Sequence, residues 1–329
     1  MGVTVNEIAA KCQVSRTTVV RALNNQSRIS NETRKRILDA ANEMGYRPNL
    51  LARSLNKGRS MMIGMVAINM ENQIFVETLN AINKAVQGLG YSLNIALNGE
   101  DCEAEKCRIQ EFADRRMEGI LLSPVNKGTA FETFLLSLHV PVVCIGNHVS
   151  DHFSTVMVDE AQAARDAVKL ILSKGYQRVV FVCPPLAMEA ERNVFSHVQR
   201  ASGFHAELDL HPEIESLVIK GENYFEQLSP VLETLEKRTA ILCSGDIYAL
   251  NIMRRFKELK IRTPRDVGIM GFDNISMLDY IVPRLTTVST NSINIASVAV
   301  NELINHISDQ NSVPKKIVLP HQIMDMETL

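Results

Sequence analysis

Residues 15–24 read SRTTVVRALN, and this stretch predicts how the N-terminal part of the chain folds. Ser15 stands where a hydroxyl can cap a helix, and Val19 and Leu23 recur with the spacing of one buried helical face. Arg16 is left on the outer surface beside the cap. The stretch therefore predicts a short amphipathic helix whose first turn presents hydrogen-bond donors to solvent.

A short helix is predicted before this one and a longer helix after it. Thr4 and Glu7 have the spacing of a capping box, so a helix is expected over residues 3–13. Residues 31–44 are predicted to form a further helix, capped by Ser30 and ended by a glycine. Two short helices joined by a tight turn are the arrangement that reads the major groove of DNA.

The charge distribution separates a DNA-binding head from a small helical bundle with a merely solvated charged face. Residues 1–59 contain 11 Lys and Arg against 4 Asp and Glu, a formal net charge of +7. The whole chain carries −2, which leaves −9 for the remainder. Such asymmetry directs one end of a chain toward a polyanion. DNA binding is therefore favoured over the bundle interpretation.

Two segments, VTVNEIAAKCQVSRTTVVRALN at 3–24 and RISNETRKRILDAANEMGYRPNLLARSLNKGRS at 28–60, resemble the head of the LacI/GalR family of bacterial transcriptional regulators. The sequence departs from the family pattern at Gln13, where the family usually has Gly, and at Val20, where it often has a small hydroxyl residue. Together with the helix positions, the resemblance implies the following DNA-binding residues: Thr4, Ser15, Arg16, Thr17, Thr18, Arg21, Asn24, Arg28, Asn49 and Leu55.

A hinge segment is expected at about residues 49–56, after the break at Pro48. It is too short to be a stable helix alone, so we expect it to be disordered off DNA and helical on it. In the family this helix pairs with that of the dimer mate and presses a leucine into the minor groove; the matching residue is Leu55. The alternative is a plain basic linker.

Composition describes an ordinary soluble protein of two or three domains. The chain has 329 residues, of which 46% are hydrophobic and 22% charged. No signal peptide and no apolar run of about 18 residues is visible, so a cytoplasmic protein is expected. The six cysteines and eight histidines are scattered without ligand spacing. We therefore expect reduced thiols, no metal and no cofactor.

From residue 61 onward, apolar strand-like runs alternate with amphipathic helical patterns, which predicts two doubly wound α/β units with a cleft between them. The resemblance implies a periplasmic-binding-protein-like core in which the chain crosses near residues 158, 289 and 319. The expected domains are a head at 1–59 and an effector-binding and dimerisation core at 60–329. The core would comprise subdomain 1 (about 61–157 and 290–318) and subdomain 2 (about 158–289 and 319–329).

Ligands of such sheets bind beyond the carboxyl ends of the strands. The Ser…Arg-x-x-Gly-aromatic segment at 196–204 and the Gly-aromatic-Asp segment at 271–273 match the family's effector-binding motifs. An Arg and an Asp across a cleft can hold adjacent hydroxyls, although the two could equally form a structural ion pair, and Phe75 could be simple core. The predicted effector-binding residues are Asn72, Phe75, Ser123, Asn147, Ser196, Arg200, Tyr224, Asp246 and Asp273.

These features favour a repressor controlled by a small polar ligand, with a sugar or sugar derivative as the expected effector. The sequence lacks a leucine heptad tail after about residue 323, so we expect a homodimer on a pseudo-palindromic operator. One rival is a regulator controlled by a protein partner, with a vestigial cleft. The other is a sugar-processing enzyme with a DNA-binding head, which is disfavoured because no nucleophile elbow and no phosphate-binding loop are present.

Substituting Leu55→Ala tests the hinge interpretation. We expect it to weaken specific operator binding and leave non-specific, salt-driven binding nearly intact, because the wedge that opens the minor groove is lost. Operator affinity and DNA bending measured on the full chain check this. Unchanged affinity together with an unchanged bend would remove the hinge helix from consideration.

Overall fold

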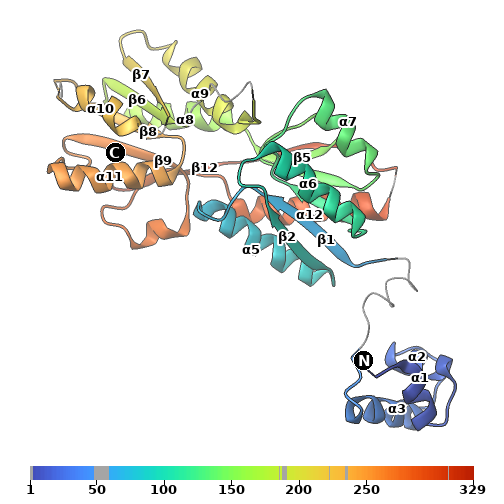
Figure 1. Ribbon diagram of the computed structural model, residues 1–329. Coiled ribbons are helices and arrows are strands. Elements are labelled where there is room, and N and C mark those ends of the chain that lie inside the picture. Colours follow the sequence, from blue (N-terminus) through green and yellow to red (C-terminus); the bar gives the residue numbers. More distant parts are fainter. Residues whose placement is uncertain are drawn as a thin grey trace. The chain divides into compact units, whose positions relative to one another are not determined.

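The computed structural model describes residues 3–47, 59–184, 186, 191–221, 223–233, 236–309 and 311–329 (Figure 1). The predicted hinge at 49–56, with Asn49 and Leu55, lies outside these residues. The chain divides into two compact units, Met1–Ser60 and Met61–Leu329, here called the head and the core. No helix in the described part of the chain is both long and apolar enough to cross a membrane.

The head contains the three predicted helices, α1 (Val5–Lys11), α2 (Arg16–Leu23) and α3 (Asn31–Glu43). Each begins at the hydroxyl residue expected to cap it. The Thr4 side chain accepts from the Glu7 amide while the Glu7 carboxylate accepts from Thr4, so the capping box is formed. Ser15 and Ser30 accept in the same way from the third residue of their helices.

One apolar core fixes the angles between these helices. Ile8, Val19 and Ile37, one from each helix, are fully buried in it. The turn between α1 and α2 places Gln13 at φ 50°, in the left-handed region that costs an ordinary residue roughly 1–2 kcal/mol. This strain matches the departure from glycine noted in the sequence.

The first sheet of the core has the order β11-β5-β4-β3-β1-β2, and all its neighbouring strands are parallel. Its strands are β1 (Met62–Ala67), β2 (Ser92–Leu97), β3 (Gly119–Leu122), β4 (Val142–Ile145), β5 (Ser154–Val158) and β11 (Lys316–Leu319). Helices α5 (Gln73–Gly88) and α12 (Ser292–Ser308) share one apolar cluster with the sheet, and α6 (Cys102–Asp114) and α7 (Thr129–Ser137) share another. Sheet and helices together form the first lobe.

The second lobe repeats this plan around a sheet of order β12-β10-β9-β8-β6-β7, in which only the β10–β12 pair is antiparallel among the described pairings. Its strands are β6 (Arg178–Cys183), β7 (Glu215–Lys220), β8 (Thr239–Cys243), β9 (Val267–Asp273), β10 (Thr286–Ser289) and β12 (Gln322–Met324). Helices α8 (Glu160–Ser173) and α9 (Phe195–Leu208) pack in one cluster, and α10 (Tyr224–Glu233) and α11 (Asp246–Leu259) in another. A short 3-10 helix, η2 (Ser276–Tyr280), follows β9.

Three chain passages join the lobes, between β5 and α8, between β10 and α12, and between β11 and β12 (Figure 1). Five parallel strands in each sheet have the doubly wound order second, first, third, fourth, fifth. The order reverses beside β1 in one sheet and beside β6 in the other, and crevices for ligands open at such points. The prediction of a helix-turn-helix head and a core of two doubly wound α/β subdomains is confirmed.

Two glycine substitutions three residues apart test the account of the head. Gln13→Gly should stabilise the head by about 0.5–1 kcal/mol, because glycine adopts positive φ without steric cost. Ala10→Gly, at an exposed position inside α1, should destabilise it by about 1 kcal/mol. Hydrogen exchange of the Ile8 and Val19 amides in the full chain measures both effects. A change in head stability of the same sign in both variants would contradict the assignment of strain to Gln13.

Candidate functional site

The surface of α2 carries the residues predicted to read DNA. Arg16 and Thr17 are exposed at the start of the helix, and Arg28 is exposed in the turn before α3. Arg21 and Thr18 are half-buried, and the Thr18 hydroxyl hydrogen-bonds the Ser15 hydroxyl at 2.8 Å. The first turn of α2 therefore presents one guanidinium and one hydroxyl side by side to solvent.

Other predicted DNA-binding side chains are already engaged in capping. Thr4 Oγ1 donates to Glu7 Oε2 at 2.9 Å. Asn24 Nδ2 donates to the Val20 carbonyl at 2.9 Å, at the C-terminus of α2. These residues hold the helices in place, and any contact they make with DNA remains a prediction.

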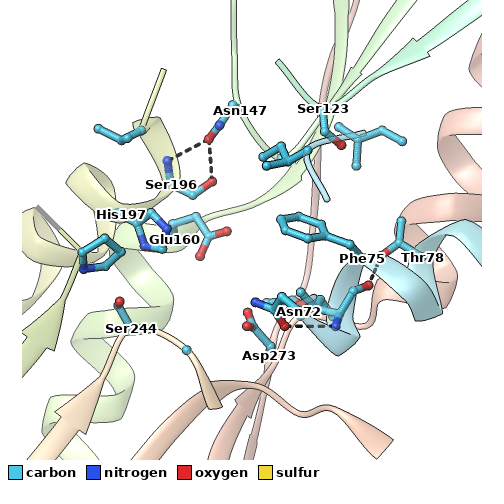
Figure 2. A pocket seen from close by; sticks show the side chains of 18 of the residues that line it. Asn72, Phe75, Thr78, Ser123, Asn147, Glu160, Ser196, His197, Ser244 and Asp273 are labelled. Atoms are coloured by element: carbon cyan, nitrogen blue, oxygen red, sulfur yellow. Dashed lines mark hydrogen bonds between the residues drawn. The ribbon is translucent and has the colours of Figure 1, made fainter. Parts of the chain in front are cut away.

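A cavity of about 440 Å³ opens between the two lobes of the core. This volume lies in the range of small-molecule sites. Its walls come from the carboxyl ends of strands in both sheets, as Figure 2 shows: Asn72 and Phe75 after β1, Ser123 after β3, Ser244 after β8, and Asp273 at the end of β9. The cavity thus occupies the crevice that the strand order creates.

Arg200 on α9 organises the second-lobe side of this cavity. Its Nε donates to Glu160 Oε2 at 2.8 Å, and Nη2 donates to Asp273 Oδ1 at 3.4 Å. Nη1 donates to the Ser244 carbonyl, and the guanidinium carbon lies 3.7 Å from the centre of the Phe272 ring. Arg200 and Asp273, predicted as a ligand-binding pair, therefore form an ion pair with each other in this structure.

Burial and nearby charges shift the pKa of Asp273. Burial raises the pKa of Asp273, an effect that nearby Arg200 opposes and the carboxyls of Asp246 and Glu160 reinforce. Asp273 also adopts φ 110°, outside the regions normally open to a residue with a side chain. Such strain costs about 1–3 kcal/mol and is concentrated at functional sites.

Hydrogen bonds join the lobes along one edge of the cavity. Asn147 Oδ1, in the first lobe, accepts from both the amide and the hydroxyl of Ser196 at 3.1 and 3.0 Å. Asn193 is 6% exposed. Its backbone amide donates to the Val125 carbonyl at 2.8 Å, and its side-chain amide donates to the His148 carbonyl at 2.8 Å. We call these contacts the seam.

Seven of the nine predicted effector-binding residues line the cavity, and Tyr224 and Asp246 do not. The Tyr224 ring instead meets Tyr248 edge-on, with 5.6 Å between centroids, and Tyr248 is the aromatic residue that reaches the cavity. Asp246 is fully buried; its carboxylate accepts from the Ile275 amide at 3.0 Å and the Thr287 hydroxyl at 2.6 Å. Asp246 therefore supports the cavity wall from behind, and neither Tyr224 nor Asp246 is among the residues that line the cavity.

Sequence reasoning missed several lining residues: Glu160, Arg192, His197, Ser244 and Tyr248. His197 lies inside the 196–204 segment, and the strand-end rule points to Ser244 without selecting it. Glu160 carries no motif, because only the packing of α8 against α9 brings it to Arg200. Among the described residues no cluster of His, Cys, Asp or Glu is arranged to hold a metal ion.

A helix-turn-helix head and a two-lobed α/β core with a cavity between its lobes define the class of ligand-responsive transcriptional regulators. Residues 4–49 match the model of bacterial regulatory proteins of the lacI family, and residues 168–328 match that of the periplasmic binding protein-like domain. The head therefore carries a DNA-binding domain of the lacI family, and most of the second lobe lies within a periplasmic binding protein-like domain.

Two relatives and one solved structure are similar to the chain over nearly its full length. Catabolite control protein A of Priestia megaterium is 26% identical over 98% of both chains, and the probable HTH-type transcriptional repressor ExuR of Bacillus subtilis is 28% identical over 96% of this chain and 95% of that one. The fold is similar to that of the lac repressor dimer bound to operator and an anti-inducer. That likeness has a TM-score of 0.87 at 22% identity and covers 100% of this chain and 99% of the other.

Removing Arg200 or Asp273 from their buried ion pairs should lower the free energy of unfolding by unequal amounts. Arg200→Met should destabilise the core by about 3–5 kcal/mol, because it leaves Glu160 and Asp273 buried without their cation. Asp273→Asn should cost only about 1 kcal/mol, because the amide oxygen can still accept from Arg200 and Arg200 keeps its closer ion pair with Glu160. Urea unfolding of the full chain, followed by circular dichroism, measures the difference. Equal losses would show that Arg200 is not the centre of the network.

Proposed function

We propose that this protein is a dimeric, sequence-specific DNA-binding repressor whose operator affinity is set by a small polar ligand in the core cavity. The ligand is a sugar or sugar derivative. The observation that supports this best is the cavity itself, which is lined by polar side chains from both lobes and bordered by a hydrogen-bonded seam.

A sugar fits the chemistry of the walls. Asn72, Asp273 and Ser196 supply hydrogen-bonding groups around the cavity, while Phe75 and Tyr248 supply aromatic surface. Sugars present hydroxyls at their edges and apolar C–H groups on their faces, so they use both kinds of wall. Charge-assisted hydrogen bonds to Asp273 would fix the orientation of adjacent hydroxyls.

Coupling to DNA would operate through the seam. A ligand shifts an equilibrium only through its differential affinity for the two states. A molecule that contacts both lobes changes their preferred separation, because some seam contacts are made only when the lobes are close. In the dimer, two heads would read the two halves of a pseudo-palindromic operator, and lobe movement would change how well the hinge segments pair.

Regulation, not catalysis, is the role we assign to the core. The relatives that the chain matches over nearly its full length are repressors and a catabolite control protein, not enzymes. A regulator of this kind acts in the cytoplasm, where its operator lies. The rival in which a protein partner controls the core is left as an outcome of the experiment below.

A two-stage experiment tests the proposal. The full chain first selects its operator from random duplexes, and sugars are then titrated into the operator complex. We expect one sugar to change operator affinity, and Asp273→Asn to abolish that response while operator binding by the ligand-free protein persists. If no sugar acts at millimolar concentration but a protein partner does, the partner-controlled rival is correct.

The DNA-reading role of α2 can be tested at one side chain. Arg16→Ala should cost about 1–3 kcal/mol at the operator and relax the preference at one or two base pairs, because a base-edge contact is lost. Lys11→Ala is a matched control: Lys11 is paired with Glu43 at 2.8 Å and should contribute little sequence preference. Arg16 is a phosphate contact if its loss weakens binding equally on every sequence.

A further inference from the structure

Two polar atoms on the second-lobe side of the cavity have no hydrogen-bond partner among the residues that the structure describes. One is Oγ of Ser244, a residue that is only 1% exposed, and the other is the buried Nδ1 of His197. Both residues line the cavity, on the wall opposite Phe75 and Asn72 (Figure 2). A buried hydroxyl without a partner is unfavourable, so a ligand that reaches it and supplies the missing hydrogen bond gains affinity.

The charges around these atoms are unfavourable for an anion. Four carboxylates line the cavity against two guanidinium groups: Glu71, Glu100, Glu160 and Asp273 against Arg192 and Arg200. Both guanidinium groups are already paired with carboxylates in the structure. Arg192 lies 2.9 Å from Glu100, and Arg200 lies 2.8 Å from Glu160. An entering carboxylate or phosphate would therefore have to break an existing ion pair and approach the remaining negative charges.

His197 adds no positive charge to offset this. Burial, together with the neighbouring Arg200, lowers the pKa of His197 to about 3, so the ring is neutral at physiological pH. A neutral imidazole has one N–H donor and one acceptor, which suits a hydroxyl group. The side chains of His197 and Ser244 thus supply hydrogen bonds without charge.

We infer that Ser244 and His197 form a neutral subsite for hydroxyl groups of an uncharged polyol, and that the surrounding carboxylates exclude acidic and phosphorylated sugars. This rests on the proposed function, because it specifies the chemistry of the same effector. It predicts two kinds of discrimination. Deoxy analogues bind more weakly because the buried polar atoms stay unpaired, and anionic analogues bind more weakly because the guanidinium groups are occupied.

Matched neutral and anionic sugars provide the first test. Calorimetry on the full chain would compare galactose with galacturonate, glucose with glucuronate and glucose 6-phosphate, and ribose with ribose 5-phosphate. In any set that binds, we expect the neutral member to bind at least tenfold more tightly. Tighter binding of an anionic member would overturn the inference and leave a sugar-controlled repressor in place. Absence of binding throughout the panel would contradict both the inference and the sugar effector.

A pair of hydroxyl deletions provides the second test. Ser244→Ala should leave the melting temperature of the ligand-free protein unchanged or raised, because its Oγ has no hydrogen-bond partner in the described part of the chain. It should weaken binding of the neutral sugar about tenfold. Thr287→Val is the control: its buried hydroxyl donates to Asp246 at 2.6 Å, so its loss should lower the melting temperature. The subsite is refuted if Ser244→Ala destabilises the free protein as Thr287→Val does and binds the sugar normally.

Discussion

The buried guanidinium of Arg200 is the interaction on which the binding edge of the second lobe depends. It joins α8 through Glu160, the end of β8 through the Ser244 carbonyl, and the end of β9 through Asp273. Close helix packing is a precondition for this, because a side chain at Gly203 on α9 would collide with the Ala161 carbonyl on α8. A wider α8–α9 spacing would draw Arg200 away from Glu160, so a backbone contact in the helix layer sets the electrostatics of the cavity.

The seam between the lobes is polar, so separating the lobes requires little free energy. The Asn193 backbone amide donates to the Val125 carbonyl. The loop that contains Val125 is fixed by the buried Glu105, whose carboxylate accepts from the Val125 and Asn126 amides at 2.8 and 2.9 Å. Seam hydrogen bonds can be exchanged for bonds to water when the lobes part, so each contributes only about 0.5–1.5 kcal/mol. A rigid loop on one lobe and exchangeable contacts to the other are what a ligand-controlled hinge requires.

Local sequence signals predicted the helix caps and the strand–helix alternation, because those depend on neighbours within a few residues. The strand-end rule placed Asn72, Ser123 and Asp273 at the cavity, but it could not tell which side chains are satisfied inside the protein. Asp246 shows this limit: it begins α11 beside the cavity, yet Ile275 and Thr287 bind its carboxylate from behind. The orphaned Ser244 hydroxyl is equally invisible in sequence, because its state depends on every neighbour brought in by the fold.

Fixing the distance between the lobes tests most directly whether lobe movement controls operator affinity. Glu77 on α5 accepts from the Ser276 amide in η2 at 2.7 Å, so cysteines at these two positions can be cross-linked across the cleft. Cys102 and Cys107 would be replaced by serine to avoid side reactions. Operator affinity would then be measured with and without the effector sugar. If lobe movement controls operator affinity, the cross-linked protein no longer responds to the sugar, whereas the uncross-linked protein does. An undiminished response after cross-linking would contradict control through lobe movement.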